Sequence, residues 1–206
     1  MVVGRMITSL TAEKLACARG DRILFEGLSF RVEAGQALAV EGANGAGKTS
    51  LLRLIAGFLS PREGRLLLKT PEGESSDSDE RAQAIGWLGH HDGLKPQLTV
   101  GEQLKSFAQL YRSTRDTDAV LEELGLARQK DFPCRFLSAG QRRRLALARL
   151  LVSGRPLWLL DEPFAALDKD GQALVARLMA LHCGQGGLVI AATHEPLGLS
   201  NASIRL

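Results

Sequence analysis

The fold of this 206-residue chain is decided by the stretch Gly42-Ala43-Asn44-Gly45-Ala46-Gly47-Lys48-Thr49-Ser50. It matches the pattern G-x-x-x-x-G-K-[ST]. The apolar run at residues 37–40 before it reads as a buried strand, and residues 50–56 after it show a helical pattern that stops at a glycine. Strand, glycine loop and helix in this order predict a phosphate-binding loop.

Each fixed position of this loop suits a phosphate chain. Glycines such as Gly42 and Gly47 let the backbone fold tightly and turn successive N–H groups onto phosphate oxygens. The start of the next helix adds its positive dipole end, Lys48 can reach the β- and γ-phosphates, and the Thr49 hydroxyl can hold Mg²⁺. A glycine-rich turn without a ligand is the alternative. We favour nucleotide binding and expect contacts from Gly42, Ala43, Asn44, Gly45, Ala46, Gly47, Lys48, Thr49 and Ser50.

The composition is that of a globular protein with one domain, or one domain with an added lobe. Hydrophobic residues make up 45% of the chain, which is ordinary for a protein with a buried core. A net charge of +3 is too small to indicate binding to nucleic acid or to an anionic membrane surface. The three cysteines form no C-x-x-C pair, so they fit a reducing cytosol and indicate neither disulfides nor zinc.

The sequence shows neither a membrane span nor a leader. No apolar run approaches the roughly 18 residues that cross a bilayer, and residues 1–6 lack the apolar core of a signal peptide. We therefore expect a soluble chain that is held at a membrane, if it works there, by another protein.

Before and after the glycine loop, the sequence predicts short strands of an antiparallel sheet that leads into a parallel core. The expected strands cover residues 10–16, 23–25, 28–32 and 65–69. The polar and acidic segment 70–81 reads as a solvated loop.

The second half predicts a helical lobe and then a return to alternating strands and helices. Residues 87–150 read as mostly helical, with apolar faces over 100–111 and 120–126. Continuous apolar runs at 157–160 and 188–193 are typical of strands buried in a parallel sheet, and a helical pattern lies between them.

Two acidic residues follow the apolar strand at 157–160. Asp161 fits a magnesium anchor, and Glu162 can polarise a water for in-line attack on the γ-phosphate. In parallel sheets, ligands gather at the carboxyl ends of the strands, where the glycine loop also lies. We therefore assign Thr49 and Asp161 to the metal and Glu162 to catalysis, with solvated acids at a strand end as the plainer alternative. His194, after the next strand, can contact the γ-phosphate as a second catalytic residue.

A second helix start in the sequence also suits an anion. It is opened by Ser138 with small residues behind it, so that a hydroxyl, backbone N–H groups and the helix dipole coincide. The arginines that follow, Arg142 to Arg144, could indicate nucleic acid, but at helical spacing they read as a solvated face. The whole stretch is Leu137, Ser138, Ala139, Gly140 and Gln141.

Together these motifs resemble the ATP-binding cassette (ABC) ATPases across essentially the whole chain. The family's Walker A motif is matched by residues 42–49, its signature by 137–141, its Walker B motif by 157–162, its D-loop by Asp168 and its switch histidine by His194. The resemblance implies a homodimer in which ATP lies between the Walker A motif of one copy and the signature of the other, so that Ser138 serves the partner's nucleotide. It also implies a membrane partner that ATP binding and hydrolysis drive.

Three positions depart from the family pattern. His90 stands at the Q-loop glutamine, Ala139 replaces the first glycine of the signature, and Arg19 stands where an aromatic ring usually stacks on adenine. A guanidinium can also stack on a base, and we count Arg19 among the ATP-binding residues. A zinc site at His90 and His91 is another interpretation, although the cysteines offer no matching spacing.

Within the family, the stretches 89–96, 137–144 and 156–164 resemble the cytochrome c maturation ATPases, the ATP-binding subunits of a so-called haem exporter of bacteria. That resemblance implies a peripheral protein on the cytoplasmic face of the inner membrane. It would work with the integral membrane subunits of the cytochrome c maturation complex to release a haem-loaded periplasmic chaperone. The cofactors are then ATP and Mg²⁺, and neither haem nor nucleic acid is expected to bind this chain.

Other functions of such a cassette stay open. The ATPase of a different importer or exporter is the main alternative, and the region 89–96, which should face the membrane partner, would distinguish them. A cassette that acts on ribosomes or DNA would need a tandem second cassette or a long insertion. A regulatory nucleotide-binding module without turnover would not need Glu162 and His194.

The expected fold is an α/β P-loop NTPase with a RecA-like core, an N-terminal antiparallel β subdomain and an inserted helical subdomain. A single ABC ATPase domain is expected over residues 7–206. Its parts are 7–86 for the antiparallel sheet and the Walker A part of the core, 87–150 for the helical subdomain with the Q-loop and signature, and 151–206 for the rest of the core.

Overall fold

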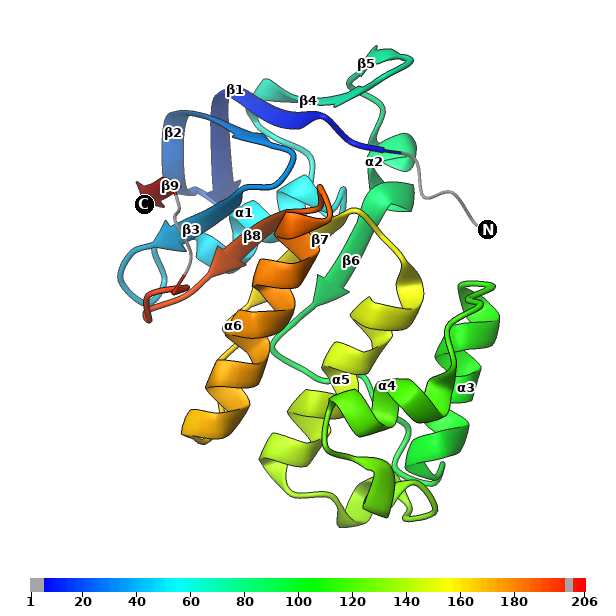
Figure 1. Cartoon of the computed structure of the whole chain (residues 1–206). Helices are drawn as coiled ribbons and strands as arrows, with labels where there is room; N and C mark the ends of the chain where they lie inside the picture. Colours follow the sequence, from blue (N-terminus) through cyan, green and yellow to red (C-terminus); the bar gives the residue numbers. More distant parts are fainter. Residues whose placement is uncertain (1–5, 199–201) are drawn as a thin grey trace.

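The computed structural model describes residues 6–198 and 202–206. Among these residues, one sheet has four strands in the order β2-β1-β4-β5, and a second has five in the order β6-β7-β8-β3-β9. A cluster of helices lies beside them (Figure 1). The expected domain 7–206 includes residues 199–201, which lie outside the described residues.

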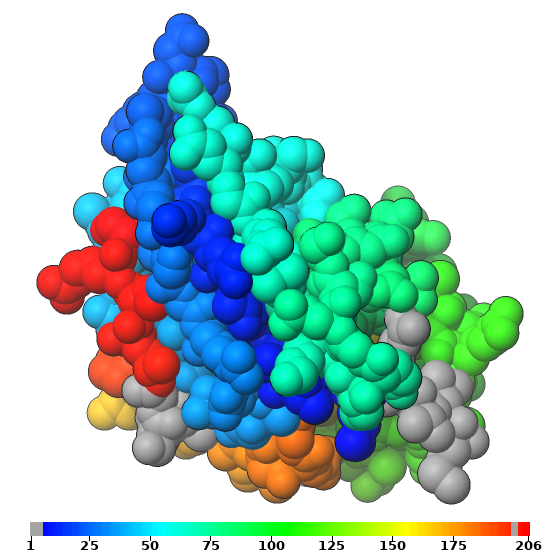
Figure 2. Space-filling view, turned by 90° about the horizontal axis from the view of Figure 1, so that it is seen from above, coloured from blue at the N-terminus to red at the C-terminus, as the bar shows by residue number. Residues whose placement is uncertain are grey.

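The four-stranded sheet is antiparallel, as the sequence predicts. β1 (Ser9–Arg19) pairs with β2 (Arg22–Glu33) on one side and with β4 (Glu63–Thr70) on the other, and β5 (Gly73–Ser75) pairs with β4. The sequence predicts two strands where the structure has the single strand β2. The predicted break falls at an irregularity within β2, where Gly27 takes a φ of +64° and the register with β1 shifts. Figure 2 shows these strands, coloured blue and cyan, side by side over one face of the molecule.

The five-stranded sheet is parallel and forms the middle layer. In spatial order its strands are β6 (Ile85–Leu88), β7 (Leu157–Asp161), β8 (Leu188–Ala192), β3 (Ala37–Glu41) and β9 (Ala202–Arg205). Every residue of β7 and β8 is buried, which confirms that their apolar runs belong to a sheet covered on both faces. β9 was not predicted because its residues are exposed or half-buried and carry no apolar pattern.

Successive residues of the parallel strands face two separate cores. Leu159 packs with α1 (Lys48–Ile55) and with the antiparallel sheet. Its neighbour Leu160 faces the opposite core, which contains α5 (Ala139–Ser153) and α6 (Lys169–Gly184). The parallel sheet is therefore held rigidly between two apolar layers, and its strand ends are fixed in position.

A helical cluster is set off from both sheets (Figure 1). It consists of α3 (Val100–Leu110), α4 (Thr117–Glu123) and the first part of α5, and its apolar core includes Leu104 and Leu145. The cluster follows β6, where the sequence predicts mostly helical structure. No helix in the described part of the chain is long and apolar enough to cross a membrane. Single-turn 3₁₀-helices lie between α4 and α5 at Ala127–Gln129 and Cys134–Phe136.

The prediction of a solvated loop over 70–81 is wrong in both halves: the strand β5 occupies Gly73–Ser75, and a helix occupies the second half. The helix α2 (Ser78–Ala84) begins there, capped by Asp77, whose carboxylate accepts hydrogen bonds from the backbone of the first turn. Arg81 is only 5% exposed, and its Nε donates to the Ile55 carbonyl oxygen at 2.7 Å. The helix is thus fixed by a cap and a buried arginine rather than by an apolar stripe, which is the signal that the sequence lacks.

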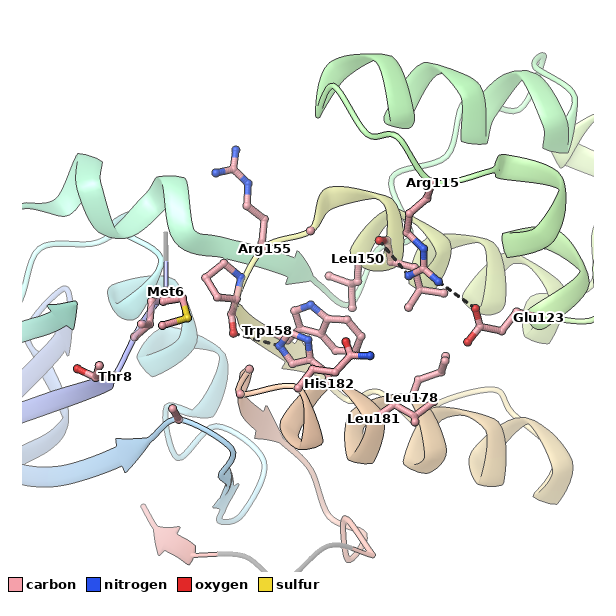
Figure 3. Close-up of a pocket in the computed structure, with 18 residues that line it drawn as sticks. Met6, Thr8, Arg115, Glu123, Leu150, Arg155, Trp158, Leu178, Leu181 and His182 are labelled. Atoms are coloured by element: carbon pink, nitrogen blue, oxygen red, sulfur yellow. Dashed lines mark hydrogen bonds and ion pairs between the residues drawn. The ribbon is translucent and has the colours of Figure 1, made fainter. Parts of the chain in front are cut away.

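A hollow of about 710 Å³ lies at the amino end of β7, beside the end of α6 (Figure 3). The Trp158 ring stacks on the His182 ring at 3.9 Å with the planes 10° apart. His182 Nε2 lies 3.0 Å from the Pro156 carbonyl oxygen, and Arg115 pairs with Glu123 on the helical side. Burial lowers the pKa of His182 from 6.5 to about 4, so the ring is neutral near pH 7.

The neutral His182 predicts a loss of stability in mild acid. Between pH 6.5 and about 4 the unfolded chain binds a proton that the folded chain does not, so the free energy of unfolding falls as the pH falls through this window. The shift corresponds to about 3 kcal/mol by pH 4. Urea unfolding across pH 4–8 should show this fall in the wild type, relative to His182→Phe, which keeps a ring against Trp158 but does not titrate. Identical pH profiles for the two proteins would contradict the prediction.

Candidate functional site

The glycine loop joins the carboxyl end of β3 to the first residue of α1. Gly47 caps the helix with a φ of +111°, and a Cβ there would lie 3.1 Å from the Cβ of Leu24. Gly42 has a φ of +146°, and a Cβ there would lie 2.9 Å from the Leu206 carbonyl oxygen. Both positions therefore need glycine, for their backbone conformation and for the close approach of neighbouring segments.

Lys48 and His194 meet in front of the loop. Lys48 is 8% exposed, and its Nζ donates to the Gly42 carbonyl oxygen at 2.8 Å and lies 3.0 Å from His194 Nε2. The same Nε2 lies 3.1 Å from Asn44 Oδ1 and 3.5 Å from Glu162 Oε1. Without a proton, Nε2 can accept a hydrogen bond from Lys48. With a proton, it can instead donate to one of these oxygens. The structure thus brings together three segments that the sequence separates.

Thr49 and Asp161 join the loop to the end of β7. The Thr49 hydroxyl lies 3.0 Å and 3.2 Å from the two Asp161 carboxylate oxygens. Asp161 is 4% exposed. A hydroxyl and a carboxylate in contact are the hard oxygen ligands that Mg²⁺ prefers. The donor set therefore fits the magnesium site that the sequence predicts.

Glu162 has an unusual backbone conformation for its residue type. Its φ is +48°, in the left-handed region, which costs a non-glycine residue about 1–2 kcal/mol. Its N–H donates to the Ala192 carbonyl oxygen at 2.9 Å. Its side chain is 32% exposed, which leaves the carboxylate open to water. Strained residues of this kind cluster at functional sites.

Lys48, Thr49, Asp161 and Glu162 line a cavity of about 600 Å³, within the range of ligand pockets. His194 is not among the lining residues and reaches this site through its contacts with Lys48 and Glu162. Seven of the nine predicted loop residues line it, whereas Gly42 and Ala46 do not. Arg19 and His90 also line it, as do Asp161 and Glu162. The hollow beside Trp158 is larger but contains none of the motif residues, so the cavity at the loop is the candidate site.

Sequence reasoning assigned no role at the nucleotide to five residues that line this cavity. They are Leu24, Arg53, Trp87, Gly89 and His91. Arg53 could have been found, because it lies four residues after Thr49 and thus on the same face of α1. Leu24 comes from the antiparallel sheet, and only the packing of the two sheets reveals its position.

The signature residues do not reach this cavity within one chain. Ser138 caps α5 by accepting from the backbone N–H of Gln141 at 3.2 Å, and the Gln141 side chain accepts from the N–H of Ser138 at 2.9 Å. Ser138 and Ala139 are exposed, and none of residues 137–141 lines the cavity. Asp168 likewise caps α6, through the N–H of Gly171 at 2.8 Å. A role at a partner's nucleotide stays a prediction for these residues.

The arginine run is not simply a solvated face. Arg143 is only 4% exposed, and Arg142 donates to the Leu137 carbonyl oxygen at 2.6 Å. The sequence-based reading fails because α5 is covered on several sides, so that even polar positions of this helix face the protein interior.

His90 and His91 are exposed and lie edge to face, with ring centroids 5.4 Å apart. Among residues 6–198 and 202–206, no group of three or more His, Cys, Asp and Glu side chains could hold a metal ion. The pair therefore has no third ligand of these types for zinc in the described chain, and both residues line the cavity at the glycine loop.

Comparisons with known proteins identify the family of the chain. The family model described as ABC transporter matches residues 25–165. The protein named cytochrome c biogenesis ATP-binding export protein CcmA from Rhodopseudomonas palustris strain BisB5 is 50% identical over 198 residues, which are 96% of this chain and 97% of the relative. The protein of the same name from Mesorhizobium japonicum is 47% identical with the same coverage.

Solved structures share the fold. A putative ABC transporter ATP-binding protein from Pyrococcus furiosus aligns with a TM-score of 0.84 and 24% identity, over 97% of this chain and 98% of its own. A bacterial Atm1-family ABC exporter with ATP bound aligns with a TM-score of 0.78 and 26% identity, over 94% of this chain and 35% of its own. The α/β cassette fold predicted from the sequence is therefore confirmed. The chain belongs to the ABC transporter family and, within it, groups with the cytochrome c biogenesis ATP-binding export proteins.

Proposed function

We propose that the chain hydrolyses ATP in the cavity between the glycine loop and the carboxyl end of β7. The observation that carries this proposal is that Lys48, Thr49, Asp161 and Glu162 line one cavity, and that His194 contacts two of them, Lys48 at 3.0 Å and Glu162 at 3.5 Å. Phosphoryl transfer needs positioning and charge stabilisation more than covalent chemistry, and these side chains supply both.

Each residue then has a distinct task. When ATP enters, Lys48 leaves the Gly42 carbonyl and donates to the β- and γ-phosphates, together with backbone N–H groups of the loop. The Glu162 carboxylate accepts a proton from the attacking water and orients it in line. His194, with Nε2 protonated, donates to the γ-phosphate.

Mg²⁺ would be held by Thr49 and Asp161, and its charge would neutralise the phosphate oxygens. Arg19 lines the cavity, and its guanidinium would stack on the adenine ring. His90 approaches from the loop after β6 and takes the place that a glutamine holds in most of the family.

A complete site requires a second copy of the chain. The glycine loop is open to solvent at Ala43, Asn44 and Gly45. Ser138 is also exposed, and its hydroxyl contacts only the capping N–H of Gln141 among the described residues. In a two-fold dimer the same surface serves both subunits. We assign the signature of each copy to the γ-phosphate of the other copy's ATP.

The biological role that we propose is the ATP-driven step of cytochrome c maturation. Support comes from the names of relatives that share about half of their residues with this chain over nearly their full length. The cassettes would bind the integral membrane subunits of that system on the cytoplasmic face of the inner membrane, and hydrolysis would release a haem-loaded periplasmic chaperone. Haem itself would not bind the cassette.

We also propose that residues 7–206 form one domain with three parts, 7–86, 87–150 and 151–206.

Removing the carboxylate charge tests the hydrolytic role. Glu162→Gln should keep ATP affinity and lower kcat by at least about 100-fold, because general bases contribute roughly that factor or more. The matched control is Glu41→Gln, at the end of β3, whose carboxylate lies 3.5 Å from Arg205 and does not line the cavity. Steady-state phosphate release and equilibrium binding of a fluorescent ATP analogue measure the two quantities. Unchanged turnover would remove Glu162 from the mechanism.

Co-purification tests the biological role. The affinity-tagged full chain, expressed at its natural level and extracted from membranes in mild detergent, should bring down integral membrane proteins that act in cytochrome c maturation. Mass spectrometry identifies them, and the untagged strain is the control. Recovery of the membrane subunits of a different transporter, or of ribosomes, would contradict the proposed role while leaving ATP hydrolysis intact.

A further inference from the structure

Arg143 reaches from the helical cluster into the core beside the proposed catalytic residues. It lies in the second turn of α5 and is 4% exposed. Its Nη1 donates to the Gly89 carbonyl oxygen at 2.7 Å, and its Nη2 donates to the carbonyl oxygens of Asp161 and Glu162, both at 2.6 Å. One guanidinium therefore joins three backbone carbonyls from two separate segments.

These two segments both border the nucleotide cavity. Gly89 directly precedes His90, which lines the cavity from the loop after β6, and Asp161 and Glu162 line it from the end of β7. The guanidinium is planar and carries donors on both sides, so it can bridge such segments where the single ammonium of a lysine cannot.

The contact with Glu162 fixes a strained conformation. Glu162 has a φ of +48°, which a non-glycine residue keeps only where its surroundings hold it in place. Its N–H is held by the Ala192 carbonyl oxygen at 2.9 Å, and its own carbonyl oxygen is held by Arg143. The peptide groups on both sides of the Glu162 Cα are therefore pinned, and the direction of the side chain is set.

Charge pairing does not explain why this arginine is buried. Within residues 6–198 and 202–206, its one ion pair is with Asp92, whose Oδ1 lies 3.4 Å from Nη1 and whose side chain is 23% exposed. Nε is buried and has no hydrogen-bond partner among the described residues. Burial lowers the pKa of Arg143, and the carboxylates of Asp92, Asp161 and Glu162 oppose that shift only in part. The backbone carbonyls are thus the main partners of this cation.

We propose that Arg143 is a positioning residue for ATP hydrolysis: it holds the Glu162 backbone so that the carboxylate faces the attacking water, and it ties that geometry to the loop that carries His90. Arg143 does not line the cavity, so it acts through Glu162 rather than on ATP. A shift of the loop at Gly89 is transmitted to Glu162 through one rigid side chain. This inference rests on the proposed catalytic role of Glu162.

Arg143→Lys tests the inference in the full chain. The lysine keeps the charge but cannot reach all three carbonyls, so the Glu162 carboxylate loses its fixed direction. We expect kcat to fall about 10- to 100-fold, as small misplacements of catalytic groups do. The KM for ATP and the affinity for a fluorescent ATP analogue should change by less than about threefold, because the glycine loop makes no contact with Arg143. Arg143→Gln, which removes the buried charge, is the second variant and should give the same pattern.

Arg144→Lys is the matched control. It changes the next residue of the same helix, whose Nη1 contacts the Leu124 carbonyl oxygen at 3.4 Å within the helical cluster. We expect its kcat to stay within about twofold of the wild type, since exposed or weakly bonded positions tolerate such changes. Thermal unfolding of all variants shows whether a loss of kcat follows from a loss of stability.

A double variant separates positioning from general damage. In single-turnover measurements over hours, adding Arg143→Lys to Glu162→Gln should lower the residual rate by no more than about twofold, because effects of residues that act as a unit are not additive. If Arg143→Lys lowered the single-turnover rate of Glu162→Gln by the same factor as it lowers kcat of the wild type, the inference would be overturned. Equal kcat values for Arg143→Lys and Arg144→Lys would overturn it too. Either result would leave the proposed role of Glu162 intact. Full turnover by Glu162→Gln would overturn the role of Glu162 and this inference with it.

Discussion

The site depends on the contact between the Thr49 hydroxyl and the Asp161 carboxylate at 3.0 Å. These residues are 112 positions apart, and they meet because β3 and β7 both pair in parallel with β8, so their carboxyl ends lie at one edge of the sheet. Each strand is buried on both faces, which fixes the edge in space. A glycine loop on β3 and an acidic pair on β7 can then share one cavity without further adjustment.

The antiparallel sheet and the helical cluster add further residues around this edge of the parallel sheet. The antiparallel sheet contributes Leu24 and Arg19 to the cavity wall. The helical cluster contributes the guanidinium of Arg143, which lies outside the cavity and donates to the backbone carbonyls of Asp161 and Glu162. A single chain therefore supplies the whole glycine loop, but the loop is open to solvent. Ser138 is also exposed and does not line the cavity at the loop. This arrangement suits an ATPase with an open state and a closed state. In the closed state a second copy covers the loop, and ATP shifts the population between the two states.

Most of the parallel core and the loop could be predicted from the sequence because their signals are local. The G-x-x-x-x-G-K-[ST] pattern is specific for a phosphate-binding loop. Unbroken apolar runs such as 157–160 and 188–193 usually indicate buried parallel strands in an α/β chain. The features that escaped prediction depend on contacts between distant segments. The helix at 78–84 is fixed by the burial of Arg81 against Ile55, and Arg143 is buried although its neighbours in sequence are arginines. Periodicity cannot show which face of a helix is covered on all sides.

The central claim is that one chain carries half of each catalytic site, and mixing two inactive variants tests it most directly. Lys48→Met disables the glycine loop, and Ser138→Arg disables the signature, so each variant alone should hydrolyse almost no ATP. In an equal mixture, half of the dimers have one intact site, and turnover should recover to about one quarter of the wild-type rate. A mixture as inactive as its components, or full activity of Ser138→Arg alone, would contradict the claim.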